Sequence, residues 1–418
     1  MNNEILERLK KVQYASRIFS VTDVSVINNV LNDLAAIAEC ETEFLLRENK
    51  RDLDLMNADD PKYDRLMLTA ERIKNIAAEI RNVANLPYPV GKLVSEKQLP
   101  NGLQIRKVSV PLGVIGIIYE SRPNVTFDVF SLCLKSGNAC VLKGSKDAEF
   151  SNKAINSLIE KALIKNKLST DIAYLMSIER EATTVMLQAV GLIDVLIPRG
   201  SMSLINYVRD NAKVPVIETG AGIVHTYIDK SADIEKAIRI VDNAKTRRVS
   251  VCNALDCLIV HESVLSKLER ICSPLNQKKV ELFADEKSYN VLKLFYDASL
   301  LHHANENSFG SEFLSMKMAI KTVSDIDEAL EHIATFSSKH SEAIVAEDKS
   351  AIEKFTRCVD AAAVYVNAST AFTDGAQFGM GAEIGISTQK LHARGPMALD
   401  ELTSYKYIIE GAGQIRNG

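Results

Sequence analysis

Short apolar runs alternate with longer amphipathic segments from Val108 onward, and this alternation constrains the fold more than any other feature of the sequence. The apolar runs that we expect to form strands are 114–119, 139–143, 194–197, 216–218 and 226–228. The intervening segments that we expect to form helices are 126–136, 147–165, 201–211 and 231–245, and a second α/β stretch covers 255–367. Short strands separated by helices indicate parallel βαβ units and a sheet buried on both faces. The predicted fold class is therefore α/β.

The two ends of the chain have different patterns. The first hundred residues are helical in pattern, and Asp60-Pro61 predicts a helix start, because Asp caps a helix and Pro suits its first turn. Asn101-Gly102 predicts a hairpin turn. Near the C-terminus, 405–409 is extended and a Gly-Ala-Gly turn follows it. This segment predicts an edge strand that could pair with another subunit.

Composition and charge exclude several classes of function. Of the 418 residues, 46% are hydrophobic and 25% are charged, and the net charge of -4 offers no basic footprint for nucleic acid. The longest apolar run, 114–118, is far too short to cross a membrane. Seven scattered cysteines without a Cys-x-x-Cys pair indicate a cytoplasmic protein. The histidines show no metal-binding spacing, so we expect no metal site.

Cys252 is the best candidate for a catalytic group. It lies in the connection between the helix that ends near Lys245 and the strand expected at 255–260. A cysteine in such a connection can project into a cleft, and positive charge or backbone N–H groups would favour its thiolate form. The alternative is a small buried hydrophobic residue, which is the usual role of a cysteine outside a disulfide.

Two further segments carry residues that suit phosphate binding. Lys143, Ser145 and Lys146 follow the end of an expected strand, where ligands gather in α/β sheets. Gly200 and Ser201 begin an expected helix, whose free N–H groups can bind an anion. Solvated lysines at a helix start and an ordinary serine cap explain the same residues equally well.

Several motifs occur together and in a fixed order. They are PLGVIGIIYESRPNVT at 111–126, LKSGNA at 134–139, VPVIETG at 214–220, SVCNAL at 250–255, YVNAST at 365–370, FTDG at 372–375, GAEIGISTQKLHARGP at 381–396 and ELTSYK at 401–406. With them the sequence closely resembles the γ-glutamyl phosphate reductases, or glutamate-5-semialdehyde dehydrogenases, a branch of the aldehyde dehydrogenase superfamily. Residues 262–310 depart from the family pattern, as do Arg247 and Val249, where the family has Gln and Pro.

The resemblance implies an aldehyde-dehydrogenase-like fold. Its parts are a Rossmann-like nucleotide-binding domain, an α/β catalytic domain that carries the cysteine, and a small β oligomerisation flap. The implied boundaries are 1–99 and 110–222 for the nucleotide-binding domain, 223–365 for the catalytic domain, 366–395 for a return segment beside the active site, and 100–109 with 396–418 for the flap.

The resemblance also implies an activity. This is the NADPH-dependent reduction of L-glutamate 5-phosphate to L-glutamate 5-semialdehyde through a Cys252 thioester, the second step of proline synthesis from glutamate. It further implies a homo-oligomer, either a dimer or a tetramer, and allows a contact with glutamate kinase. Two alternatives stay open: another acyl-CoA- or aldehyde-linked enzyme of the superfamily, and a non-catalytic partner of the kinase.

Residue roles follow from the matching motifs. Cys252 matches the nucleophile, Asn124 the amide that holds the oxyanion, and Glu218 the general base of hydrolytic aldehyde dehydrogenases. The cofactor contacts that we expect are Lys143, Ser145, Lys146, Gly200, Ser201 and Glu312. The candidates for substrate binding are Arg122, Ser369, Thr370 and Arg394.

Overall fold

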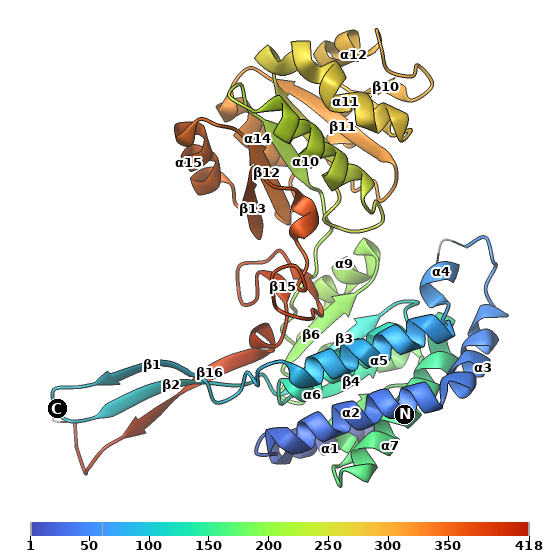
Figure 1. Ribbon diagram of the computed structural model, residues 1–418. Helices are drawn as coiled ribbons and strands as arrows, with labels where there is room; N and C mark the ends of the chain where they lie inside the picture. Colours follow the sequence, from blue (N-terminus) through green and yellow to red (C-terminus); the bar gives the residue numbers. More distant parts are fainter. Residues whose placement is uncertain (1, 61, 417–418) are drawn as a thin grey trace. The chain divides into compact units, whose positions relative to one another are not determined.

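The computed structural model describes residues 2–60 and 62–416, which fold into two compact units (Figure 1). Unit 1 contains the described residues up to Thr219 together with 379–385 and 397–416. Unit 2 contains Gly220–Phe378 and Ile386–Pro396. Among the described residues, no helix has both the length and the apolar character needed to cross a membrane.

A four-stranded parallel sheet forms the centre of unit 1, in the order β5-β4-β3-β6. Its strands are β3 (Val114–Tyr119), β4 (Ala139–Lys143), β5 (Ala173–Leu175) and β6 (Val195–Arg199). Every residue of β3 and β4 is buried, as expected of parallel strands covered on both faces. Because Ile118 pairs with Lys143, the two strands end at the same edge, where ligands bind in such sheets.

Helices pack around this sheet, with α1 and α6 against β3 and β4 and α7 against β5. The helices of unit 1 are α1 (Asn2–Phe19), α2 (Val24–Cys40), α3 (Thr42–Leu53), α4 (Tyr63–Leu66), α5 (Ala70–Asn85), α6 (Asn124–Lys135), α7 (Glu149–Lys165), α8 (Arg180–Gln188) and α9 (Met202–Asn211). Their apolar stripes form the core, as in α2, where Ile27, Leu31 and Leu34 are fully buried.

A three-stranded antiparallel flap projects from the rest of unit 1 as a long ribbon (Figure 1). Its strands are β1 (Leu93–Gln98), β2 (Gln104–Pro111) and β16 (Thr403–Glu410), in the order β1-β2-β16. Gly102, at a φ of 86°, makes the tight turn between β1 and β2, and β16 lies at an edge. The hairpin turn and the C-terminal edge strand predicted from the sequence are therefore confirmed. The hairpin is longer than 100–109, because it begins at Leu93.

A seven-stranded parallel sheet forms the centre of unit 2, in the order β10-β9-β11-β8-β7-β12-β13. The strands are β7 (His225–Ile228), β8 (Cys257–His261), β9 (Glu281–Ala284), β10 (Leu301–His303), β11 (Lys317–Val323), β12 (Ser341–Val345) and β13 (Ala363–Val366). The helices are α10 (Ile234–Thr246), α11 (Leu268–Gln277), α12 (Glu286–Leu292), α13 (Glu306–Phe309), α14 (Ile326–Phe336) and α15 (Lys349–Cys358). Two apolar cores are built from alternate strand residues: Leu258 belongs to one and Ile259 to the other.

The remaining elements are short. Among the described residues they are the 3₁₀ helices η1 (Lys146–Ala148), η2 (Thr170–Ile172), η3 (Glu262–Lys267), η4 (Thr370–Phe372) and η5 (Asp400–Leu402), and a two-stranded sheet of β14 (Gly385–Ser387) and β15 (Gly395–Met397).

Two predicted elements are wrong. The helix expected from Asp60-Pro61 is interrupted after α4, and α5 begins only at Ala70, because the Thr69 side chain caps it by accepting from the Arg72 N–H. Pro61 itself lies outside the described residues. The strand expected at 216–218 forms only an isolated bridge between Leu196 and Val216.

Candidate active site

Cys252 lies on the turn that joins α10 to β8 in unit 2, and it is half-buried. The turn is closed by the Ala254 N–H, which donates to the Val251 carbonyl at 3.1 Å. Thr370 Oγ1 donates to the Asn253 carbonyl at 2.9 Å. The sulfur is thus carried by a braced turn at the edge of the core, whereas Cys257 is fully buried in β8.

Gly222 fixes the other side of this turn. A Cβ atom at Gly222 would lie 1.8 Å from the carbonyl oxygen of Cys252, so no other residue fits here. The Gly222 N–H donates to Glu312 Oε1 at 2.9 Å. Glu312, which the resemblance assigns to the cofactor, accepts this bond and so holds the backbone segment that packs on Cys252.

A buried Lys–Asp pair flanks the same turn. Lys245 Nζ donates to the Leu255 carbonyl at 2.9 Å and lies 4.0 Å from Asp256 Oδ1. Both residues are buried, and loss of water lowers the pKa of Lys245 to about 8 and raises the pKa of Asp256 to about 7. The pair joins the end of α10 to the start of β8, and Asp256 also accepts from the Phe313 N–H.

Asn124 is the first residue of α6 in unit 1, just after β3. Its Nδ2 donates to Asp128 Oδ2 at 2.9 Å, one helical turn further on. Burial and the nearby Glu79 carboxylate raise the pKa of Asp128 to about 7. An amide nitrogen carries two N–H groups, so Asp128 orients the side chain and uses only one of them.

Lys143 ends β4 beside a cavity of about 220 Å³ that is lined by residues including Gly144, Met176 and Glu179. Lys143 Nζ donates to the carbonyls of Gly144 and Ile178, both at 3.1 Å, and burial lowers its pKa. Ser145 and Lys146, the next two residues predicted to contact the cofactor, lie in different environments. Ser145 Oγ accepts from the Ser121 N–H at 3.1 Å, which ties β3 to β4, and Lys146 is exposed.

The Gly200-Ser201 turn at the start of α9 already binds a carboxylate. The Ser201 N–H donates to Glu120 Oε2 at 2.8 Å, and Ser201 Oγ donates to Glu120 Oε1 at 2.9 Å. A Cβ atom at Gly200 would lie 2.6 Å from Glu120 Oε2. The N-terminus of α9 therefore holds the Glu120 carboxylate, and the predicted binding of a cofactor anion at this turn stays a prediction.

Glu218 lies after α9, one residue before Thr219, where the first segment of unit 1 ends. Arg209 Nη1 approaches Glu218 Oε2 at 3.8 Å, and the carboxylate side chain is 30% exposed. A partly exposed carboxylate with a guanidinium at this distance can act as a proton acceptor or a simple surface charge.

The four substrate candidates differ in exposure. Arg122 is exposed in unit 1, whereas Ser369 and Thr370 are buried in unit 2. Ser369 Oγ accepts from the Ala371 N–H, so both hydroxyl groups are used to shape the segment that braces Cys252. Arg394 Nη2 lies 2.8 Å from Asp360 Oδ1.

Asp360 gathers three cations around it. Lys339 and Lys390 lie 3.4 and 3.0 Å from Asp360 Oδ2, in addition to Arg394. Hydrogen bonds from Arg394 and Lys390 lower the pKa of Asp360 to about 2, so its carboxylate stays charged. The cluster carries an excess of positive charge, which suits an anion, and its Lys390 and Arg394 belong to the 381–396 motif.

Comparison with known proteins identifies the family. The sequence model of the aldehyde dehydrogenase family matches residues 32–284. The γ-glutamyl phosphate reductase of Chlorobium phaeobacteroides (strain BS1) is 58% identical over 416 residues, which cover 100% of both chains. That of Bacteroides thetaiotaomicron is 58% identical and covers 97% of both chains. A solved γ-glutamyl phosphate reductase from Thermotoga maritima is 40% identical and has a TM-score of 0.95, covering 99% of this chain and 100% of that one. This chain belongs to the γ-glutamyl phosphate reductase family.

More distant members of the superfamily share the fold. An acetylating aldehyde dehydrogenase from Geobacillus thermoglucosidasius is 18% identical and has a TM-score of 0.69, covering 100% of this chain and 98% of that one. The aldehyde-dehydrogenase fold predicted for this γ-glutamyl phosphate reductase family member is therefore confirmed, and so is the family that its motifs indicated.

Three residues at these sites were missed in the sequence. Asp128 orients Asn124, Glu120 binds Ser201, and Gly222 packs on Cys252. Asp128 could have been found, because it is four residues after Asn124 on an expected helix and so shares its face. The other two contacts join segments more than 25 residues apart, and no local pattern in a γ-glutamyl phosphate reductase sequence reports them.

Proposed function

We propose that this chain reduces L-glutamate 5-phosphate to L-glutamate 5-semialdehyde with NADPH and releases phosphate, as the second step of proline synthesis from glutamate. The observation that carries this proposal is the half-buried Cys252 on its braced turn, in a chain 58% identical over its full length to γ-glutamyl phosphate reductases. The proposed substrate follows from the names of those relatives, and the proposed nucleophile is Cys252 on this turn.

Cys252 acts first in the proposed reaction. Its thiolate attacks the acyl carbon, and the negative oxygen that forms is stabilised by an N–H of Asn124 and by the backbone N–H of Cys252. Each such donor typically contributes about 3–4 kcal/mol to the transition state. Phosphate leaves, and the acyl group remains on sulfur as a thioester, which is more electrophilic than a carboxylate.

Bound NADPH would supply the hydride that reduces the thioester carbon. The Cys252 turn then holds the resulting thiohemiacetal until it collapses to the aldehyde and the thiolate. Two places suit the cofactor: the cavity beside Lys143 and the N-terminus of α9. The N-terminus of α9 binds the Glu120 carboxylate, so it suits an anionic group of the cofactor. A pyrophosphate at Ser201 would displace that carboxylate.

The 2′-phosphate of NADPH would be bound by a lysine beside the same cavity. Lys143 is buried and donates to two backbone carbonyls, which leaves the exposed Lys146 better suited to this role. We assign the ribose to Lys143, the pyrophosphate to the Gly200-Ser201 turn and the nicotinamide ribose to Glu312.

Substrate recognition is proposed for two groups of residues. Arg122 and the cations around Asp360, including Arg394, would attract the anionic substrate. Ser369 and Thr370 would act by shaping the turn that carries Cys252, because their hydroxyl groups are bonded to backbone.

Phosphate-dependent reduction of NADP by glutamate semialdehyde tests the proposal in the reverse direction. We expect activity in the wild type, none in Cys252→Ala, and unchanged activity in Cys358→Ala, which removes an exposed cysteine of the same unit. Retained activity in Cys252→Ala, or equal activity without phosphate, would exclude the thioester route.

The flap supports a further part of the proposal, a homo-oligomer of two or four chains. Large apolar side chains are exposed on it, including Leu93, Val94, Tyr407 and Ile409 at 56–60%. Edge strands with such residues favour pairing with a second chain. Light scattering of Tyr407→Lys/Ile409→Lys should give monomers if the flap assembles the protein, and an unchanged mass would contradict this. A cytoplasmic location and a contact with glutamate kinase remain predictions from the sequence, the latter testable by co-sedimentation.

A further inference from the structure

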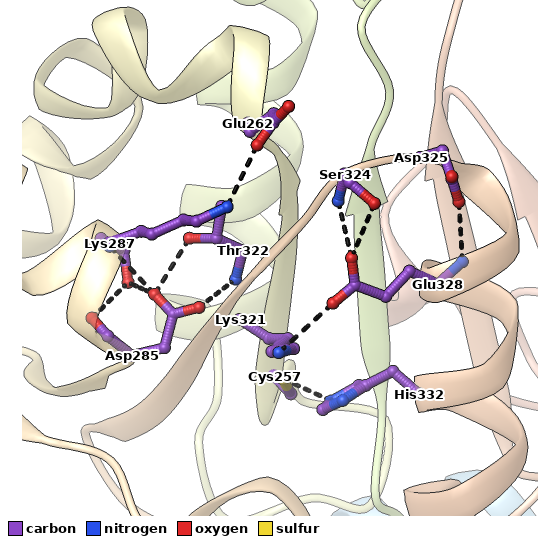
Figure 2. Close-up of polar contacts among 11 residues, drawn as sticks. Cys257, Glu262, Asp285, Lys287, Lys321, Thr322, Ser324, Asp325, Glu328 and His332 are labelled. Atoms are coloured by element: carbon purple, nitrogen blue, oxygen red, sulfur yellow. Dashed lines mark hydrogen bonds and ion pairs between the residues drawn. The ribbon is translucent and has the colours of Figure 1, made fainter.

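Three potential metal ligands that have no role assigned above meet inside unit 2. They are His225 at the start of β7, Cys257 at the start of β8 and His332 on α14. All three are buried, and their ligand atoms lie within 4.8 Å of one another. Figure 2 shows His332 pointing from α14 toward Cys257, and the Nε2–Sγ distance is 3.6 Å.

The strand register brings two of these ligands together. His225 and Cys257 are direct partners across the parallel β7–β8 pair, so their side chains leave the same face of the sheet. Helix α14 packs against this face and supplies His332, whose ring contacts Phe309 and Phe336 at centroid distances of 5.1 and 4.8 Å. The cluster is therefore enclosed by protein.

His225 has the hydrogen-bonding pattern of a metal ligand. Its Nδ1 lies 3.1 Å from one oxygen of the buried Glu342 and 3.2 Å from the other, so Nδ1 carries the proton. Its Nε2 is then unprotonated and carries a free lone pair. This atom is buried and has no hydrogen-bond partner among the described residues. A carboxylate behind a histidine in this way commonly orients the ring toward a metal ion.

The charges of the cluster and its one closest ligand pair suit a divalent ion. Zinc with sulfur at about 2.3 Å and nitrogen at about 2.0 Å holds the two ligand atoms roughly 3.5 Å apart in tetrahedral geometry, close to the 3.6 Å observed. A divalent cation, the Cys257 thiolate and the Glu342 carboxylate would sum to zero charge.

We propose that His225, Cys257 and His332 bind one zinc-like transition-metal ion as its three protein ligands, with a water molecule in the fourth tetrahedral position. Glu342 holds His225 in place as its outer hydrogen-bond partner, and on binding the Cys257 thiol releases its proton to solvent. The ion would tie α14 to the starts of β7 and β8. Gly222, which packs on the Cys252 turn, is only three residues before His225, so the ion would also steady the backbone around Cys252.

Metal content and Co²⁺ spectroscopy test the proposal without any activity measurement. The full-length protein, freed of any affinity tag, would be produced in minimal medium with Zn²⁺ or with Co²⁺, so that the ion is present while the chain folds. We expect one metal ion per chain after dialysis, and in the Co²⁺ protein a near-ultraviolet charge-transfer band from a bound thiolate.

The variants separate this site from adventitious binding. Cys257→Ala should lose the charge-transfer band and most of the metal, and His332→Gln should lose most of the metal. Cys272→Ala and His340→Gln, which alter a buried cysteine and a buried histidine of the same unit outside the cluster, should keep both signals. Cys252→Ala should also keep both signals, because the half-buried Cys252 lies outside the cluster.

Two results would overturn the proposal. One is a wild-type protein that, produced with Co²⁺, shows no thiolate charge-transfer band, an outcome that does not depend on how any variant folds. The other is a band that survives Cys257→Ala and disappears in Cys252→Ala, which would place the metal on the half-buried Cys252 turn.

Discussion

His340 makes the stability of this protein sensitive to mild acid. The residue precedes β12, is fully buried, and has its Nδ1 2.8 Å from Ser341 Oγ. Its Nε2 has no hydrogen-bond partner among the described residues. Burial lowers the pKa of His340 from 6.5 to about 4, because the charged imidazolium would lose its water.

The direction and size of the effect follow from linkage. Below pH 6.5 the unfolded chain takes up a proton at His340 while the folded chain does not, until the pH approaches 4. The stabilising effect of the neutral ring is therefore complete above pH 6.5 and is lost as the pH falls. Each pH unit in this window is equivalent to about 1.4 kcal/mol, so the folded state loses about 2 kcal/mol by pH 5 from this residue alone.

Urea unfolding at about pH 7.5 and at about pH 5 measures this loss. Carboxylates titrate over the same range, so the useful quantity is the difference between the wild type and His340→Gln, which keeps a polar side chain but cannot titrate. We expect the wild type to lose about 2 kcal/mol more than the variant between the two pH values. Protein concentration must be fixed, since assembly shifts apparent stability.

His303→Gln is the matched control, because this histidine of the same unit is 58% exposed in its side chain. It should show nearly the same pH dependence as the wild type. If His340→Gln loses as much stability as the wild type on acidification, the imidazole is already protonated in the folded state at pH 5, and the argument from burial fails.

Four further predictions concern the sites in the two units. Glu218→Gln should keep far more reductase activity than Cys252→Ala, because phosphate, the acyl acceptor in reverse, needs no activated water; equal inactivity of the two variants would contradict this. Lys146→Ala should raise the KM for NADPH about tenfold and leave the KM for NADH unchanged. The reason is the loss of one charged contact to the 2′-phosphate, which contributes about 1.5 kcal/mol. Steady-state kinetics with both cofactors measure the two KM values. Asp128→Ala should lower kcat about tenfold with little change in KM, since it releases the Asn124 amide; a KM effect alone would argue against an orienting role. Lys245→Met should cost about 3–5 kcal/mol in urea unfolding by leaving Asp256 buried without its partner, and Lys245→Met/Asp256→Asn should recover part of it.

The sequence predicted the fold well wherever local pattern decides structure. The buried runs 114–119 and 139–143 became β3 and β4 with the expected bounds, and Gly102 turned the flap hairpin. Prediction failed where tertiary contacts decide. The buried Asn49 side chain bonds the Leu66 carbonyl and the Leu68 N–H, 17 and 19 residues away, and so separates α4 from α5. Residues 216–218 meet a single strand residue through one bridge. Propensity and apolar spacing contain no information about either contact.

The candidate sites divide in the same way. Cys252 was selected for its place between a helix and a strand, Asn124 through the resemblance, and Ser201 through its place at a helix start. Asp128 lies four residues after Asn124 on the same helix, but the partner of Ser201 comes from across the fold. Glu120 reaches Ser201 because β3 and β6 are neighbours in the sheet, although 81 residues separate the two in sequence.

The His–Cys cluster shows why a search by spacing excludes too much. Metal-binding motifs are recognised when two ligands share one turn or one helix, which places them a few residues apart. In a parallel sheet, two neighbouring strands can each contribute one ligand at paired positions of the register. The crossover helix between the strands then sets how many residues separate the two ligands in sequence. His225 and Cys257 are such a pair, 32 residues apart and yet direct neighbours in the register. A ligand set built this way has no short spacing in sequence, so the histidine spacing that predicts no metal site is silent about this cluster.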